Sequence, residues 1–318
     1  MNKNLDTQGK KEGRPGGHPE KGLFLAIGMF DGVHCGHRKL IQTAVEEASA
    51  AGGQAAVLTF WPHPSVFFQA PEPTRMIYDS IRRTEILQKL GVDRVWETPF
   101  DSSLAGIAAE DFPYWLKQKH PFLKKIFVGA NWRFGKGRRG DAAMIEELGP
   151  REGFAVCAME RLAHGGEPIS SSRIRDLLQK GDIEAANELL GEAYQVRGIV
   201  EPGQQLGGRI GFPTLNLPWP NDLLPALGVY GVKVRRQGED VWRNGVSNLG
   251  RRPTVTHGRP LPRLEVHLLG PEPVAAGTGD PLEVRFCFYV RPEQRFPSVD
   301  ELSQQIARDK EAAEQRFA

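Results

Sequence analysis

Apolar runs alternate with helical patterns over the first half of the chain. The run LFLAIGMF at 23–30 is almost wholly apolar, and a glycine-spaced turn separates it from a helical pattern over about 37–51. A second apolar run follows at 55–60. Strand, helix, strand at this spacing is a βαβ unit, which predicts a parallel sheet with ligands at the carboxyl ends of its strands.

Further segments continue this alternation as far as about residue 160. Helical stretches are expected near 80–90 and 110–119, and strands at 125–129 and 155–159. The first half therefore predicts a doubly wound α/β domain. Two short helices over 172–191, divided at Gly181, are expected to join it to the second half.

From about Tyr194 the pattern changes to short alternating runs separated by Gly and Pro. The runs are YQVRGIV, GVYGVKVRR, NGVSNLG, RLEVHLLG and LEVRFCFYV. This pattern predicts antiparallel β-structure, which we expect to close as a small β-barrel. Ser298, with Glu301 three residues later, has capping-box spacing and predicts a final helix to about residue 317.

Composition supports two folded domains rather than one. The 318 residues are 40% hydrophobic and 25% charged, which is ordinary for a globular protein and long for a single domain. Residues 1–21 are polar and rich in Gly and Lys, so we expect a flexible tail there.

Charge and cysteine content exclude several classes of function. The formal net charge of +2 indicates neither a nucleic-acid nor a membrane partner, and no run nears the roughly 18 apolar residues that span a bilayer. Cys35, Cys157 and Cys287 form no CxxC pair, which predicts free thiols and a cytoplasmic protein. The oligomeric state stays open.

The segment GMFDGVHCGH at 28–37 combines glycines with two imidazoles at a predicted helix start. Its glycines allow a ligand close to the backbone, and His34 and His37 face the same side where the helix dipole favours anions. Such imidazoles can donate hydrogen bonds to phosphate oxygens during nucleotidyl transfer. A metal-binding pair or two structural histidines are the alternatives.

A second segment, ISSSRIR at 169–175, also opens a predicted helix. Its hydroxyls, helix-start N–H groups and guanidinium suit the phosphates that leave as pyrophosphate. Serines in this position are alternatively helix caps without a ligand. The two segments together favour a nucleotidyl-transfer site.

The second half carries a glycine-rich loop and two candidate groups for phosphoryl transfer. The loop, at 203–216, has no GK[ST] and is not a P-loop. Thr214 and Asn216 lie two apart, so on an extended segment they share a face where they can hold Mg²⁺ on ATP. Glu265 on a predicted strand is a candidate base for a primary hydroxyl, with an outward-facing strand residue as the alternative.

These motifs resemble a known family. GMFDGVHCGH with ISSSRIR resembles the HxGH nucleotidyltransferases, and LTFWPHP (58–64) with VGANWRFGKGRRGD (128–141) resembles their FAD synthetase branch. GRIGFPTLNL, GVYGV, GVSNLGRRPTV and RLEVHLLG resemble riboflavin kinase. Over about 22–317 the chain is thus similar to the bifunctional riboflavin kinase/FAD synthetases.

The resemblance implies two ATP-using reactions and their substrates. The barrel would convert riboflavin to FMN, and the α/β domain would convert FMN to FAD with release of pyrophosphate, both with Mg²⁺ and ATP. It implies an adenylyltransferase domain over 22–190 and a kinase domain over 191–318.

The resemblance also implies individual site residues. In the first domain ATP would meet His34, His37, Arg175, Gly28, Phe30, Asp31, Gly36, Ser171 and Ser172, and the flavin Asn131, Trp132 and Phe134. In the second domain ATP would meet Gly203, Gly207, Gly211, Thr214 and Asn216, with Mg²⁺ on the last two and Glu265 as base.

The chain departs from the family's usual pattern at two places. Met29 stands where relatives often have Asn, a change that is expected to be tolerated, whereas the segment after Glu265, over 270–282, lacks the usual aromatic turn, which could weaken the kinase. An adenylyltransferase with a weakened or inactive kinase domain, and a non-catalytic flavin-binding regulator, are therefore alternatives. A nucleic-acid-binding barrel is the weakest.

Three further sites carry weaker expectations. His63, between two prolines, is expected to be held mainly by turn geometry. The basic cluster of Lys136, Arg138 and Arg139 either steers anionic substrates or forms a solvated loop. Modification of Cys35, inside the histidine turn, is expected to crowd the phosphates.

Overall fold

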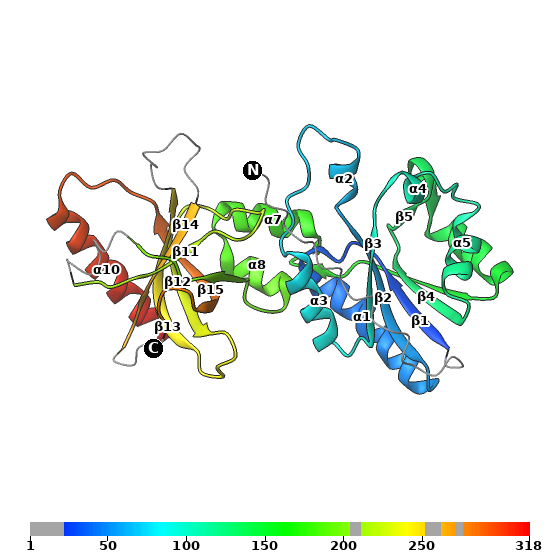
Figure 1. Cartoon of the computed structure of the whole chain (residues 1–318), viewed down its shortest axis with the longest axis horizontal. Helices are drawn as coiled ribbons and strands as arrows, with labels where there is room; N and C mark the ends of the chain where they lie inside the picture. Colours follow the sequence, from blue (N-terminus) through cyan, green and yellow to red (C-terminus); the bar gives the residue numbers. More distant parts are fainter. Residues whose placement is uncertain (1–21, 204–210, 252–261, 271–275) are drawn as a thin grey trace, which may run out of the picture.

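The computed structural model describes residues 22–203, 211–251, 262–270 and 276–318. Figure 1 shows a parallel sheet with its helices at one end of the molecule, a barrel at the other, and the helices α7 and α8 between them. The predicted fold class, a doubly wound α/β domain followed by a small antiparallel barrel, is confirmed. The expected tail at 1–21 lies outside the described residues.

The parallel sheet has five strands in the order β3-β2-β1-β4-β7. They are β1 (Leu23–Ile27), β2 (Gln54–Trp61), β3 (Arg94–Pro99), β4 (Leu123–Gly129) and β7 (Ala155–Met159). The edge strand β3 has only half-buried and exposed side chains, and its sequence lacks the apolar run that predicted the other strands. The order reverses between β1 and β4, and a ligand is expected at such a switch point.

Helices and short strands complete this domain. The helices are α1 (Cys35–Ala50), α2 (Pro64–Phe67), α3 (Ser80–Lys89), α4 (Ser102–Ala105), α5 (Phe112–Lys119) and α6 (Ala142–Leu148), with short 3-10 segments at Asp31–Val33, Lys136–Arg138 and Gly149–Glu152. Two small ribbons pair β5 (Arg133–Phe134) with β6 (Gly140–Asp141) and β8 (Ala163–His164) with β9 (Glu167–Pro168).

Successive residues of the central strand face opposite layers, as a period of two requires. Phe24 and Ala26 pack in one core with helices α1 and α3, whereas Leu25 and Ile27 pack in another with α5 and α6. Both faces of the sheet are therefore covered, and the free space for a ligand is at the ends of the strands.

The helices α7 (Ser171–Lys180) and α8 (Ile183–Leu190) join the domains as the sequence predicted. Ser170 caps α7 by accepting a hydrogen bond from the Arg173 N–H, and Gly181 ends it with φ of 83°. This left-handed conformation is readily adopted by glycine, which explains the division at that position.

The second domain is a six-stranded antiparallel sheet that nearly closes into a barrel. Its strands, in the spatial order β10-β15-β12-β13-β14-β11, are β10 (Gln195–Ile199), β15 (Pro281–Pro292), β12 (Gly228–Arg236), β13 (Arg243–Arg251), β14 (Pro262–Leu268) and β11 (Leu215–Pro218). An isolated bridge between Glu201 and Asn216 links the two edges. The final helix α10 (Val299–Phe317) begins after Ser298, whose hydroxyl accepts from the Glu301 N–H as predicted.

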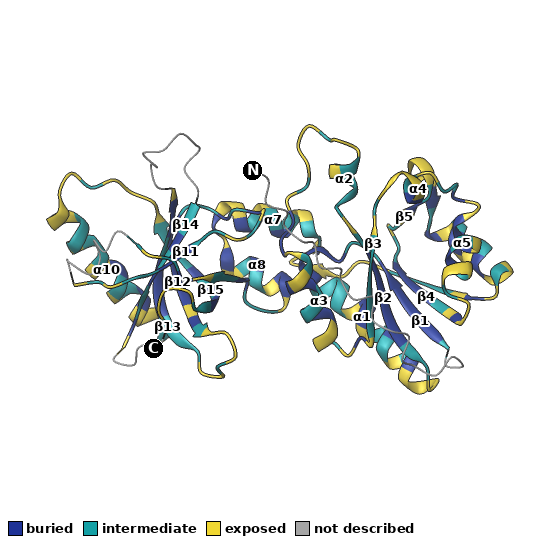
Figure 2. Cartoon of the chain, viewed as in Figure 1, coloured by how far each residue is buried: buried dark blue, intermediate teal, exposed yellow. Residues whose placement is uncertain are grey.

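One hydrophobic core runs from the sheet through α7 and α8 into the barrel. At the junction Tyr78 of the first domain stacks on Tyr194, with ring centroids 5.7 Å apart, and both side chains are buried. Figure 2 shows buried, intermediate and exposed segments on the helices α7 and α8 that connect the domains. Buried Glu283 of β15 pairs with Arg197 and Arg235, and Arg197 also reaches Glu85 of α3. The junction is therefore packed and ionically tied rather than a loose linker.

Candidate active sites

The turn between β1 and α1 holds its backbone in conformations that side chains seldom adopt. Phe30 and Val33 have φ of 49° and 42°, and Gly32 between them has φ of 77°. Strain of this kind persists only where the surroundings enforce it, and it concentrates at functional sites. The turn delivers His34 to the N-cap of α1, where its Nδ1 accepts from the His37 N–H at 3.3 Å.

His34 and His37 form a stacked pair at the start of the helix. Their ring centroids lie 3.6 Å apart with planes 15° from parallel, and Phe30 meets His37 edge-on. Burial lowers the pKa of His34 to about 4, with Arg161 adding a smaller effect, and burial with repulsion from His34 holds the pKa of His37 well below its usual value. Both imidazoles are neutral at pH 7, so they can donate a hydrogen bond without carrying charge.

The start of α7 is tied to the histidine turn by two contacts. The Ser171 hydroxyl donates to the Asp31 carbonyl at 2.9 Å, and Arg175 donates to the Asp31 carboxylate at 2.9 Å. The other carboxylate oxygen of Asp31 accepts from the Ile77 N–H, and Asp31 is only 2% exposed. The tertiary fold thus brings two segments about 140 positions apart in the chain together.

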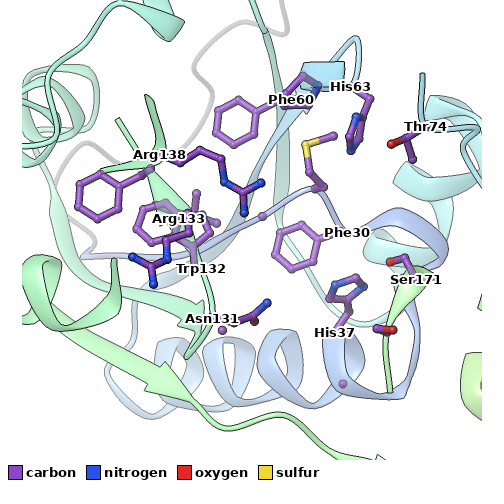
Figure 3. A pocket seen from close by; sticks show the side chains of 18 of the residues that line it. Phe30, His37, Phe60, His63, Thr74, Asn131, Trp132, Arg133, Arg138 and Ser171 are labelled. Carbon is purple, nitrogen blue, oxygen red and sulfur yellow. The ribbon is translucent and has the colours of Figure 1, made fainter. Parts of the chain in front are cut away.

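A cavity of about 880 Å³ extends from this turn along the carboxyl ends of the strands. Its polar end is formed by His34, Gly36, His37 and the serines 170–172. Figure 3 shows His37 and Ser171 on one side, Trp132, Arg133 and Arg138 on the other, and Phe30 and Asn131 between them.

The far end of the cavity is aromatic. Trp132 stacks on Phe134 with centroids 4.7 Å apart, and Phe112 packs on both rings. Phe60 and Phe100 add a further wall. A flat conjugated ring system fits between such side chains, because aromatic groups stack favourably on one another.

Most predicted residues of the first domain line this cavity. They are Gly28, Phe30, His34, Gly36, His37, Asn131, Trp132, Phe134, Ser171 and Ser172. Asp31 and Arg175 do not line it; they lie behind it as an ion pair. Of the basic cluster only Arg138 reaches the cavity, while exposed Arg139 faces Glu110.

The expectation that modification of Cys35 crowds the phosphates is wrong, because the side chain does not face them. Its thiol lies 3.4 Å from the Glu188 carbonyl of α8, and a Cβ atom at Gly191 would come within 3.0 Å of the sulfur. The side chain thus points to the junction between domains and not to the phosphate end of the cavity, because the helical turn carries it away from His34 and His37.

Sequence reasoning missed several residues of the cavity. His63, expected only to shape a turn, does cap α2 by accepting from the Ser65 N–H, but it also lines the cavity. Burial lowers its pKa to about 4, with Arg175 and Arg83 contributing. Phe60, Phe100 and Arg161 come from separate strand ends and loops, so no local pattern marks them as neighbours.

The second candidate site lies where β11, β14 and β13 run side by side. Asn216 of β11 stands directly opposite Glu265 of β14, and Glu265 stands opposite Asn248 of β13. The Asn216 amide donates to the Thr214 hydroxyl at 3.2 Å, so these two side chains meet on one face as predicted. Asn248 belongs to a quoted motif but was not expected as a site residue.

The glycine-rich loop at 203–216 begins beside Asn216 of this second site. A Cβ atom at Gly203 would lie 2.4 Å from the Asn216 amide nitrogen, so a side chain cannot be placed there without moving Asn216. Gly211 has φ of 89° in open space. Gly207 and residues 271–275 of the altered 270–282 segment lie outside the described residues.

The described residues contain no group of three or more His, Cys, Asp or Glu side chains that could hold a metal ion. Among the described helices, none combines the length and apolarity needed to cross a bilayer.

Comparison with known proteins divides the chain at the same junction. A family model for FAD synthetase matches residues 18–173, and one for riboflavin kinase matches residues 190–317. The bifunctional riboflavin kinase/FMN adenylyltransferase of Escherichia coli K12 is 38% identical over 300 residues, covering 94% of each chain. That of Bacillus subtilis is 36% identical over 298 residues, covering 92% of each.

A solved structure shares the whole two-domain arrangement. A protein from Streptococcus pneumoniae described as a macrolide-efflux protein superposes with a TM-score of 0.82 at 28% identity, covering 94% of this chain and 95% of that one.

Proposed function

The chain belongs to the family of bifunctional riboflavin kinase/FMN adenylyltransferases, and on that premise we propose how its residues divide the two reactions. The protein phosphorylates riboflavin to FMN and adenylylates FMN to FAD, using ATP for both steps. We assign adenylyl transfer to residues 22–190 and the kinase reaction to residues 191–318.

In adenylyl transfer, an FMN phosphate oxygen attacks the α-phosphorus of ATP and pyrophosphate leaves. The neutral imidazoles of His34 and His37 would donate hydrogen bonds to α-phosphate oxygens as negative charge accumulates there. Ser171, Ser172 and the N–H groups at the start of α7 would bind the departing phosphates, where the helix dipole favours anions. Asp31 would hold Arg175 beside them rather than contact ATP.

The flavin ring of FMN would occupy the aromatic end of the cavity, against Trp132 and Phe134. Asn131, between the two ends, would meet the flavin near its phosphate-bearing chain. The observation that carries this assignment is the single cavity, which joins a phosphate-binding helix start to an aromatic wall and so matches both halves of FAD.

In the kinase reaction the primary hydroxyl of riboflavin attacks the γ-phosphorus of ATP and ADP leaves. Glu265 would accept the hydroxyl proton as general base. Thr214 and Asn216 offer neutral oxygen ligands on one face, which fits a Mg²⁺ ion that takes its remaining ligands from phosphates and water. When bound, Mg²⁺ would neutralise phosphate charge.

Two variants test the assignment of the two sites. Glu265→Ala should abolish FMN formation from riboflavin while FAD is still made from supplied FMN. Replacing His34 and His37 together by Ala should stop pyrophosphate release while FMN accumulates. Separation of riboflavin, FMN and FAD by chromatography reads out both reactions. FMN formation that survives in the Glu265 variant, or unchanged FAD output in the histidine variant, would refute the corresponding site.

The same products separate the alternatives. An inactive kinase domain predicts FAD from FMN but none from riboflavin, and a regulator predicts bound flavin without turnover. Because both steps consume ATP, we place the enzyme in the cytoplasm and expect small-molecule partners, without nucleic acid.

A further inference from the structure

The proposed base Glu265 has a second polar neighbour, on the side away from Asn216. Asn248 of β13 stands opposite Glu265 across the β13–β14 ladder, as Asn216 does across the β11–β14 ladder. Directly opposed residues in antiparallel strands share a face, with Cβ atoms about 4.5–5.5 Å apart. The three side chains therefore form a row, Asn216, Glu265 and Asn248.

The alternation along β13 confirms the face on which Asn248 lies. Ser247 and Leu249 are 2% and 0% exposed and point to the barrel interior, so Asn248 points outward. Val246, on the same outward face, packs with Ala313 of α10, whereas Asn248 stays partly exposed. Asn248 thus keeps part of its side chain accessible on the outer face of the sheet.

The Asn248 carboxamide has no hydrogen-bond partner among the described residues, unlike Asn216, which is engaged with Thr214. A Cβ atom at Gly250 would lie 2.5 Å from a Glu293 carboxylate oxygen and 3.1 Å from the Asn248 amide nitrogen, so glycine at this position leaves space for both side chains.

We propose that Asn248 is a substrate-binding residue of the kinase site that recognises the secondary hydroxyls of the ribityl chain. This inference rests on the proposed role of Glu265. With the primary hydroxyl at the Glu265 carboxylate, the next hydroxyls of the chain are a few ångströms away, the spacing of opposed side chains on neighbouring strands. An amide both donates and accepts, as a polyol requires.

The three side chains of this row would have different roles in the kinase reaction. Asn216 faces Thr214 and the phosphate side, Glu265 takes the proton, and Asn248 holds the chain that carries the attacking hydroxyl. Losing one such hydrogen bond should cost about tenfold in kcat/KM for riboflavin.

The test compares two substrates in the full-length enzyme. Riboflavin carries three secondary hydroxyls that a flavin with a 5-hydroxypentyl chain lacks, although both offer a primary hydroxyl. Asn248→Leu should lower kcat/KM for riboflavin about tenfold and leave that for the hydroxypentyl flavin within about twofold. Asn244→Leu, which changes the same residue type on the same face of β13 but away from Glu265, should leave both unchanged.

FAD formation from FMN in the same variants monitors folding. If Asn248→Leu disturbs it, Asn248→Ala replaces it in the comparison. An equal loss for both flavins, or no loss for riboflavin, overturns the proposal. Failure of the Glu265 assignment would show separately, as FMN formation that survives in Glu265→Ala.

Discussion

Asp31 offers a direct test of how the fold organises adenylyl transfer. Its carboxylate accepts from Arg175 and from the Ile77 N–H, both at 2.9 Å, in a site where the side chain is 3% exposed. Burial raises the pKa of Asp31 above its usual value, while the positive charge of Arg175 opposes that rise. In Asp31→Asn the new amide keeps the Ile77 contact but directs an NH₂ group at the guanidinium.

The expected loss of stability in Asp31→Asn follows from the loss of one partner of a buried ion pair. Such a loss costs about 3–5 kcal/mol when both groups are buried, and Arg175 is 18% exposed, so we expect about 3 kcal/mol in the free energy of unfolding. A displacement of the guanidinium by about 1 Å costs roughly 100-fold in rate if it aids the transition state. The kcat for FAD formation should therefore fall about 100-fold.

Steady-state FAD formation from FMN and urea denaturation measure the two effects. The kinase reaction of the same chain is the control and should stay within about twofold. If Asp31 acts through Arg175, adding Asp31→Asn to Arg175→Ala should lower kcat little further. A full 100-fold loss in that background, or an unchanged kcat in the single variant, would refute the positioning role.

Three further outcomes are expected. The pKa of His34 is about 4 in the folded protein and about 6.5 in the unfolded chain, so its contribution to stability is complete above pH 6.5 and is lost as the pH falls towards 4. His34→Gln should therefore reduce the pH dependence of the free energy of unfolding between pH 5 and 6.5 by about 1 kcal/mol per pH unit. An unchanged pH dependence would contradict this. Trp132→Ala should raise the KM for FMN about tenfold without changing riboflavin phosphorylation, measured by product chromatography. Arg197→Met leaves buried Glu283 with Arg235 as its remaining ion-pair partner. The free energy of unfolding, measured by urea denaturation, should fall by about 3 kcal/mol while both activities persist at 25 °C. Unchanged stability would show that the pair at the junction contributes little.

Local patterns in the sequence predicted most of the secondary structure correctly. Apolar runs marked β1, β2 and β4, as is expected for buried strands, and also the partly exposed edge strand β7. The edge strand β3 was not predicted, because its sequence VWETP is half exposed and contains no apolar run. Ser298 and Gly181 marked helix ends through hydrogen bonds and backbone conformations that involve only near neighbours.

For the candidate sites too, residues within a continuous motif were predicted and residues from separate segments were not. His34, His37 and the serines after Ile169 were predicted because each motif is a continuous segment at a helix start. Phe60, Phe100 and His63 were not, because they reach the cavity from a strand end and separate loops.

The sequence by itself therefore determined the two fold types, most of the strands and the phosphate-binding motifs, all of which depend on residues close together in the chain. Only the tertiary structure decided that Arg175 is held by Asp31, that Cys35 faces the domain junction, and that Asn248 stands beside Glu265. These depend on packing and strand register between distant segments, and many different sequences can satisfy the same long-range contact.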